Sequence, residues 1–226
     1  MTRVDLPAQF AADRPSVTAA TERLVTSISE LSDEDIRRAS LLPGWTIGHC
    51  LTHLARNADG ICNLVTWAIS GQRTPMYPSM ADRDADIESG AGRGANEHRD
   101  DIASTALRLD AAFDQLANAG ADALERLVIF GAPPSDTPPN TPAVDLAFAR
   151  LREVTIHHAD LGLADFGYAD FDAAFTARTL TFVEARSGSS TVSGPAVDLL
   201  TWRLGRGTPS SLHDADGNPP GEAPAW

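Results

Sequence analysis

The chain has 226 residues, with 18 basic and 31 acidic side chains and a formal net charge of −13. All the basic residues are arginine, which excludes a Schiff-base lysine, a lysine general base and a Walker-type phosphate loop. The acidic excess argues against nucleic-acid binding, because a phosphate backbone needs a basic stripe. No apolar run reaches about 18 residues, so we expect neither a membrane-spanning helix nor a membrane partner.

The two cysteines, Cys50 and Cys62, lie in one segment that reads as a helix. Twelve residues of helix rise about 18 Å, which is too far for a disulfide. The N-terminal residues lack the basic-then-apolar layout of a signal peptide. We therefore expect a reduced, cytoplasmic protein. A monomer is the default expectation for its oligomeric state.

Helical spacing of apolar residues predicts a first helix from Pro15 to Leu31, with Pro15 in its first turn. Ser32 is expected to cap a short second helix. The clearest helix runs from Ile47 to Ile69, capped by Thr46 and stopped by Gly71.

The middle of the chain predicts two more helices separated by irregular segments. Residues 82–89 are short and charged and suit one or two helical turns, whereas 95–116 read as a long helix. A proline-rich loop spans 131–142, and Thr141 with Pro142 is expected to open a helix that reaches Gly162. Four long helices with polar connections predict a four-helix bundle.

After Leu163 the sequence changes character. Phenylalanines cluster from 166 to 175, a Ser- and Gly-rich stretch follows at 187–194, and 195–204 predict another helix. Short strands are expected near 211–213. We therefore expect a mostly α protein with a four-helix bundle over residues 1–165 and a smaller α/β domain over 166–226.

Histidine and glutamate side chains on two of the predicted helices suggest a metal site. His53 lies at the margin of the apolar stripe of its helix, and Glu153 and His157 are four residues apart on another. Two histidines and a carboxylate form a common zinc ligand set, and bundles build such sites from facing helices. Spacing alone leaves two alternatives open: a hydrogen-bonded Glu–His pair without metal, and a competing pair of His49 with His53.

Four separated segments resemble the mycothiol-dependent maleylpyruvate isomerases. They are Leu42–Asp59, Met76–Glu88, Leu151–Gly162 and Ser193–Gly207, and they keep the family's order over nearly the whole chain. The resemblance implies a DinB-type metal-binding bundle followed by a smaller α/β domain.

The resemblance also implies specific roles. The family's zinc ligands carry over onto His53, Glu153 and His157, and its essential arginine onto Arg83. The implied reaction is cis–trans isomerisation of maleylpyruvate to fumarylpyruvate, with mycothiol as thiol cofactor and a dicarboxylate as substrate. Zinc would hold the sulfur as the nucleophilic thiolate, and Arg83 would bind a substrate carboxylate. Without the resemblance, Arg83 reads as a surface residue paired with a neighbouring aspartate.

Other polar residues near these motifs are candidates for supporting roles. Asn57 and Asp160 are positioned to accept the free N–H of a ligating histidine, and Tyr77 and Trp45 to wall a substrate pocket. His158 points away from the Glu153–His157 face, although we leave open whether it or His49 joins the site. The remaining histidines, His98 and His213, are expected at the surface, and both cysteines are expected to pack in the core.

Competing functions share this ligand set. A mycothiol S-transferase would use the same metal with another electrophile, and a non-catalytic regulator would keep bundle and metal without turnover. A metal-free scaffold is the third alternative. The ligand set also accepts iron, cobalt or nickel.

Overall fold

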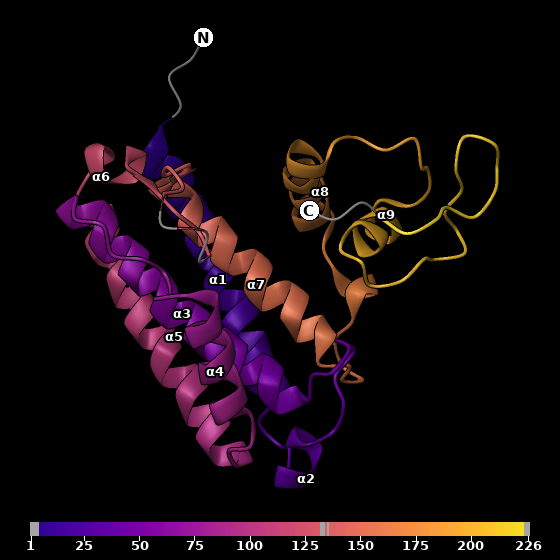
Figure 1. Cartoon of the computed structure of the whole chain (residues 1–226), viewed down its shortest axis with the longest axis horizontal. Coiled ribbons are helices and arrows are strands. Elements are labelled where there is room, and N and C mark those ends of the chain that lie inside the picture. The colour runs from indigo at the N-terminus through magenta and orange to yellow at the C-terminus, as the bar shows by residue number, and fades with distance from the viewer. Residues whose placement is uncertain (1–4, 132–133, 135, 224–226) are drawn as a thin grey trace. The chain divides into compact units, whose positions relative to one another are not determined.

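The structure, a computed structural model, describes residues 5–131, 134 and 136–223. The chain divides between Leu163 and Ala164 into two compact units. The fold is mostly α, as the sequence predicts (Figure 1). Within the described part of the chain, no helix is both long and apolar enough to cross a membrane.

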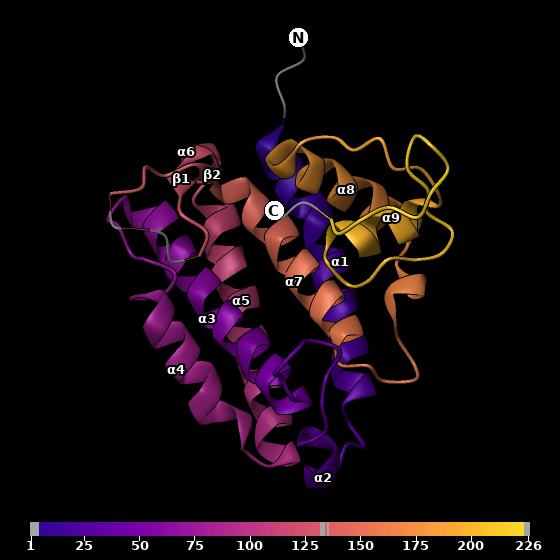
Figure 2. The ribbon, with the colours of Figure 1, turned by 45° about the vertical axis from the view of Figure 1, so that its right-hand side comes forward.

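Four long helices form the bundle of the first unit. They are α1 (Leu6–Ser27), α3 (Ile47–Ser70), α5 (Ala95–Asn118) and α7 (Leu146–Asp160). Helix α3 packs against α5 and α7, and α1 packs against α7 (Figure 2). The described residues of this unit also form shorter helices: α2 (Asp33–Ile36), α4 (Met80–Ala91), which lies along α3, and α6 (Ala121–Glu125).

Helix α1 begins earlier than the sequence predicts, so placing Pro15 in the first turn is wrong. The Asp5 side chain caps the helix by accepting from the backbone N–H of Ala8 at 3.1 Å. Pro15 lies inside the helix, where it costs one backbone hydrogen bond. The added turns bury Phe10, whose ring meets Phe113 edge-on at 5.4 Å between centroids. This contact explains why the helix continues through the proline.

The predicted boundaries of α3 are confirmed to within one residue. The Thr46 hydroxyl accepts from the backbone N–H of His49 at 3.3 Å, which satisfies one of the orphan donors of the first turn. Gly71 ends the helix with φ of 76°, a left-handed conformation that favours glycine. Ser32 likewise caps α2, as predicted. Helix α4 is longer than predicted because Ser79 caps it three residues before Asp82.

Helix α7 starts later than predicted, because Thr141 and Pro142 form a strand instead of a cap. β2 (Thr141–Pro142) pairs antiparallel with β1 (Leu127–Val128), Leu127 opposite Pro142, and a 3₁₀ turn (Ala143–Asp145) leads into α7. In a two-stranded ribbon, the missing N–H of Pro142 can face away from the ladder. Residues 132, 133 and 135 of the predicted proline-rich loop lie outside the described residues.

The bundle core consists of two apolar clusters. One contains Phe10, Ile61, Phe113 and Leu146, and the other contains Leu24, Leu51, Ile102 and Val154. Along α3, α5 and α7 the clusters are separated by buried polar residues: Asn57, Thr105 and Arg150. We call these three residues the polar layer. A buried polar layer needs hydrogen-bond partners, and those of Arg150 become important below.

The second unit contains a 3₁₀ turn (Tyr168–Asp170), α8 (Ala173–Ser187) and α9 (Ala196–Arg203). The sequence did not predict α8, which Asp172 caps by accepting from Phe175 N at 2.8 Å. The rings of Phe171 and Phe175 meet edge-on at 5.2 Å. Among the described residues, β structure in this unit is limited to one antiparallel bridge between Ser193 and His213.

Candidate metal centre

Three side chains predicted as metal ligands converge from two helices of the bundle. His53 on α3 has its Nε2 3.0 Å from Oε2 of Glu153 on α7. His157, one turn further along α7, has its Nε2 3.9 Å from the same oxygen. The two imidazole rings meet edge-on with centroids 4.6 Å apart. The structure therefore brings the two histidines and the glutamate into one cluster.

The electrostatics of this cluster suit metal ligation. Burial, and after it the electrostatic interaction with the neighbouring His157, lower the pKa of His53 to about 4, so the His53 ring is neutral near pH 7. Burial opposes ionisation of Glu153, but the hydrogen bond from His53 and the electrostatic interactions with His53, His157 and Arg150 lower its pKa to about 2. A neutral imidazole and an ionised carboxylate are the forms that donate to a cation.

The donor set also fits a divalent metal in size. Ligand atoms about 2.1 Å from a tetrahedral ion lie about 3.4 Å from one another. Here one ligand atom from each residue lies within 4.8 Å of the other two. His53 is buried, whereas Glu153 and His157 are partly exposed, so the cluster has one open side. Three protein ligands with an open side are typical of catalytic rather than structural zinc sites.

Arg83 reaches this cluster from α4. Its Nη2 lies 3.2 Å from Nδ1 of His53, and its Nη1 lies 2.7 Å from the Asp84 carboxylate. Arg83 therefore pairs with a neighbouring aspartate, as one sequence interpretation expects, and it also contacts a candidate ligand; its contact with a substrate carboxylate stays a prediction. Helix α4 comes this close because Gly48 and Gly90 lack side chains: a Cβ on Gly48 would lie 2.1 Å from Ala91 O.

Asp160 lies beside the second ring nitrogen of His157, which is the position that the sequence predicts for it. Its Oδ2 lies 2.8 Å from Nδ1 of His157, and its side chain is fully buried. A carboxylate at Nδ1 leaves Nε2 of the same ring facing Glu153 and the open side of the cluster. Histidine ligands are usually oriented by such a partner on the second ring nitrogen.

Asn57 was expected beside a ligating histidine, but the structure places it elsewhere. Its Oδ1 accepts from Nη1 of Arg150 at 2.8 Å, and the position beside Nδ1 of His53 belongs to Arg83. The reason is that one helical turn carries Asn57 past His53 into the polar layer. Tyr77 lies close by: burial raises its pKa to about 12, and Asn57 and Arg83 both interact with its hydroxyl.

The aromatic and histidine neighbours occupy separate positions. Trp45 lies against His53 with ring centroids 5.6 Å apart and stacks on His49 at 6.2 Å. His49 completes the N-terminal cap of α3 and faces Glu88 at 3.2 Å, so it is not part of the cluster. His158 is also separate, with its Nε2 2.8 Å from Ser27 Oγ on α1.

The expectation that His98 lies at the surface is wrong. Its side chain is 1% exposed, and burial lowers its pKa. The reason is its place on the buried face of α5, three residues after Ala95 and four before Ile102. His213 is exposed, as expected. Cys50 is fully buried and Cys62 is partly buried.

Arg150 was missed by sequence reasoning. It is fully buried on α7, three residues before Glu153, and it contributes to lowering the pKa of that carboxylate. A signal was present, because Leu146, Arg150 and Val154 follow each other at i, i+4 spacing. A charged residue in the middle of such an apolar stripe indicates a buried polar site.

Comparison with known proteins identifies relatives of the chain. Residues 17–162, more than half of the chain, match the family model described as the mycothiol maleylpyruvate isomerase N-terminal domain. No curated protein matches. Two solved structures share the fold: the mycothiol-dependent maleylpyruvate isomerase, at 24% identity and a TM-score of 0.83, and a histidine-to-alanine mutant of it, at 23% and 0.82. Each comparison covers 96% of this chain and 97% of the other. The chain belongs to the mycothiol maleylpyruvate isomerase N-terminal domain family.

Proposed function

We propose that this protein is a mycothiol-dependent isomerase that converts maleylpyruvate to fumarylpyruvate, with His53, Glu153 and His157 as ligands of a zinc ion. The observation that carries the proposal is the convergence of these three side chains with Arg83 beside them. Membership of the family supports it.

When bound, the metal and the thiol would supply a sulfur nucleophile whose reversible addition to the conjugated double bond would permit rotation and then return the thiol unchanged. The protein's own contribution is to hold the donor atoms. Glu153 provides the negative charge and His53 a neutral ring, and Asp160 fixes the orientation of His157. Trp45 packs against the ring of His53.

Arg83 has a second task, which follows from proton placement on His53. A neutral imidazole that binds a cation through Nε2 carries its proton on Nδ1, and an arginine cannot donate to that N–H. With a metal bound, the guanidinium of Arg83 would be free to bind a carboxylate of the substrate instead of His53. Such a charge-assisted pair also stabilises negative charge that develops next to the carboxylate.

The charges near the site explain how a chain of net charge −13 can bind a dicarboxylate substrate. Arg83 and Arg150 both lie close enough to the cluster to influence its charges: Arg83 acts on His53, and Arg150 on Glu153. A divalent metal adds two more positive charges at the same place. Glu153, Asp84 and Asp160 offset the charges of the two arginines, so the local balance of charge becomes positive only when the divalent metal is bound.

Turnover of maleylpyruvate, measured with and without mycothiol and with and without added zinc, tests the proposal. We expect isomerisation only when both are present. Glu153→Gln is expected to lose zinc and activity together. Elemental analysis of protein purified without a histidine tag checks the metal. A protein that neither holds a divalent metal nor gains activity from zinc would contradict the proposal.

A matched pair of arginine variants tests the carboxylate contact. Arg83→Met is expected to lower kcat/KM about 10- to 100-fold, the range for losing a charge-assisted hydrogen bond. Arg38→Met is the control, because Arg38 also pairs with an aspartate of its own segment but lies outside the cluster. Normal turnover by Arg83→Met would refute this role. Accumulation of a mycothiol conjugate in place of fumarylpyruvate would indicate an S-transferase.

A further inference from the structure

A cavity of about 490 Å³ opens between α1 and α5, within the bundle unit. Its walls are mostly apolar and come from both helices: Val17 and Val25 from α1, and Leu107, Leu109 and Phe113 from α5. The volume lies in the range of small-molecule sites, which are typically apolar with a few placed polar groups. None of the three candidate metal ligands lines it.

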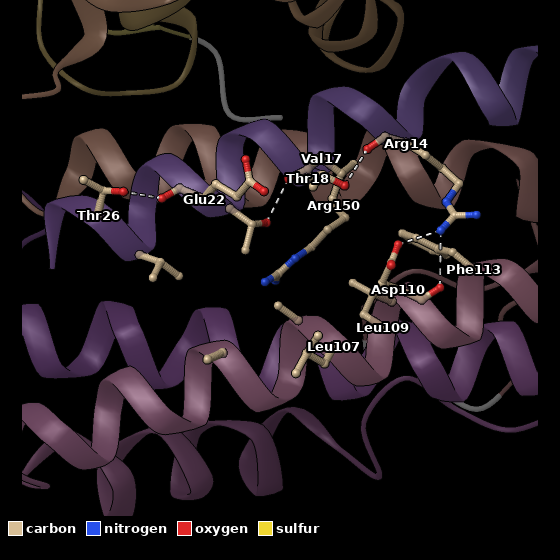
Figure 3. A pocket seen from close by; sticks show the side chains of 14 residues that line it. Arg14, Val17, Thr18, Glu22, Thr26, Leu107, Leu109, Asp110, Phe113 and Arg150 are labelled. Atoms are coloured by element: carbon tan, nitrogen blue, oxygen red, sulfur yellow. Dashed lines mark hydrogen bonds and ion pairs between the residues drawn. The ribbon is translucent and has the colours of Figure 1, made fainter. Parts of the chain in front are cut away.

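Arg150 reaches this cavity from α7 and ends in it (Figure 3). Its Nη1 donates to the backbone oxygen of Leu54 at 2.8 Å and to Oδ1 of Asn57 at 2.8 Å. Its Nη2 is buried and has no hydrogen-bond partner among the residues that the structure describes. The side chain as a whole is 1% exposed.

An unpartnered guanidinium nitrogen in an apolar cavity requires an explanation. A buried donor without an acceptor is destabilising, and more so when the group is charged, so native proteins rarely leave one. Burial lowers the pKa of Arg150 to about 10, and the side chain is therefore still a cation near neutral pH. The missing partner is an acceptor, and a negatively charged one suits it best.

The charged residues at the rim of the cavity limit how much negative charge a ligand can carry. Arg14, the other cation of the lining, is already engaged by Asp110 at 2.6 Å and by Asp114. Asp110 and the exposed Glu22 place acidic groups at the rim, and these repel a second negative charge. A ligand that fits carries one anionic group to place against Arg150 and an apolar body to lie between α1 and α5.

We propose that this cavity is a binding site, separate from the metal cluster, for an organic monocarboxylate with an apolar body. The carboxylate accepts from Nη2 of Arg150, and the apolar body contacts Val17, Val25 and Leu107. The cavity selects a ligand with one carboxylate, whereas the substrate proposed for the metal cluster carries two, so the two sites select different molecules.

Calorimetric titration of the zinc-loaded full chain with three probes tests the site. Octanoate carries both features, octan-1-ol lacks the charge and acetate lacks the apolar body. We expect octanoate to bind at least about tenfold more tightly than either of the other two. Absence of octanoate binding up to millimolar concentration would overturn the proposal, as would equal affinity for octan-1-ol.

Variants locate the binding. Ala103 lines the cavity from an exposed position on α5, so Ala103→Trp is expected to fill it and weaken octanoate at least about tenfold. Ala111→Trp is the matched control, because Ala111 is exposed on the same helix and does not line the cavity. These variants avoid Arg150 itself, whose removal from the core could unfold the chain. Equal behaviour of the two tryptophan variants would overturn the assignment.

A third variant separates this site from the metal cluster. Arg83→Met is expected to leave octanoate affinity unchanged, because Arg83 does not line the cavity. A loss of octanoate binding in Arg83→Met would place the ligand at the metal cluster and refute a separate site. This outcome is independent of whether the protein isomerises maleylpyruvate.

Discussion

Replacing Asp160 with asparagine tests how far zinc affinity depends on the partner of one ligand. The carboxylate is fully buried and its Oδ2 lies 2.8 Å from Nδ1 of His157. It makes His157 a stronger donor and fixes the ring so that Nε2 faces Glu153. Asparagine has nearly the same volume, so the substitution removes charge and leaves the packing of α7 intact.

The expected loss follows from the behaviour of such partners. Removing the carboxylate behind a histidine ligand typically lowers metal affinity 10- to 100-fold, or about 1.4–2.7 kcal/mol. The asparagine Oδ1 can still accept from Nδ1 and preserve part of the orientation, so we expect the lower end, near tenfold. All three proposed ligands stay in place, and the variant should therefore still bind zinc at stoichiometric concentration.

Competition with a chromophoric chelator measures the zinc affinity of Asp160→Asn. Glu88→Gln is the matched control, since Glu88 also faces a histidine nitrogen, Nε2 of His49 at 3.2 Å, but is 81% exposed and outside the cluster. We expect Glu88→Gln to bind zinc as the wild type does. An unchanged affinity in Asp160→Asn, or an equal loss in both variants, would refute the reasoning.

Three further predictions concern packing and titration. Phe113→Ala should destabilise the bundle by about 3–5 kcal/mol in chemical denaturation, because it removes a buried ring packed edge-on against Phe10; a loss below about 1 kcal/mol would contradict this packing. Burial raises the pKa of the Cys62 thiol to about 11, so this thiol should be alkylated slowly at pH 7. The double variant Cys50→Ala/Cys62→Ala should keep isomerase activity. Loss of turnover in a folded double variant would indicate that a cysteine of the chain is the nucleophile. In Tyr168→Phe, which leaves Tyr77 as the single tyrosine, ultraviolet titration should give a midpoint near 12, and a midpoint near 10 would show an exposed phenol. Because the folded pKa is raised, the stability contributed by the neutral phenol is fully present below about pH 10 and is lost as the pH rises through 12.

The sequence predicted elements correctly where the signal is local. Thr46 and Gly71 delimit α3 because capping and left-handed backbone depend on a few consecutive residues. It failed where a distant contact overrides the local preference. Pro15 lies within a helix because Phe10 packs on Phe113 of α5, and Thr141 joins a strand because residues 127–128 pair with it.

The candidate site divides in the same way. Glu153 and His157 share a face because they are four residues apart on one helix, so the sequence could pair them. That His53 meets them depends on how α3 and α7 are staggered, and the family resemblance supplied this information before the fold did. The sequence prediction for His98 is wrong because all its neighbours from 96 to 101 are polar, whereas its spacing from Ala95 and Ile102 puts it on the buried face of α5.

By itself, the sequence determined the chemistry that the chain can offer: no lysine, no suitably placed cysteine nucleophile, and a set of two histidines and a glutamate on helices. Only the tertiary structure decided which partner each group receives. Arg83 meets His53 because glycines at 48 and 90 let α4 approach α3, and Arg150 ends in a cavity because α1 and α5 leave space between them. The physical reason is that spacing along one helix follows from its fixed pitch, whereas contacts between helices depend on the packing of side chains far apart in the sequence.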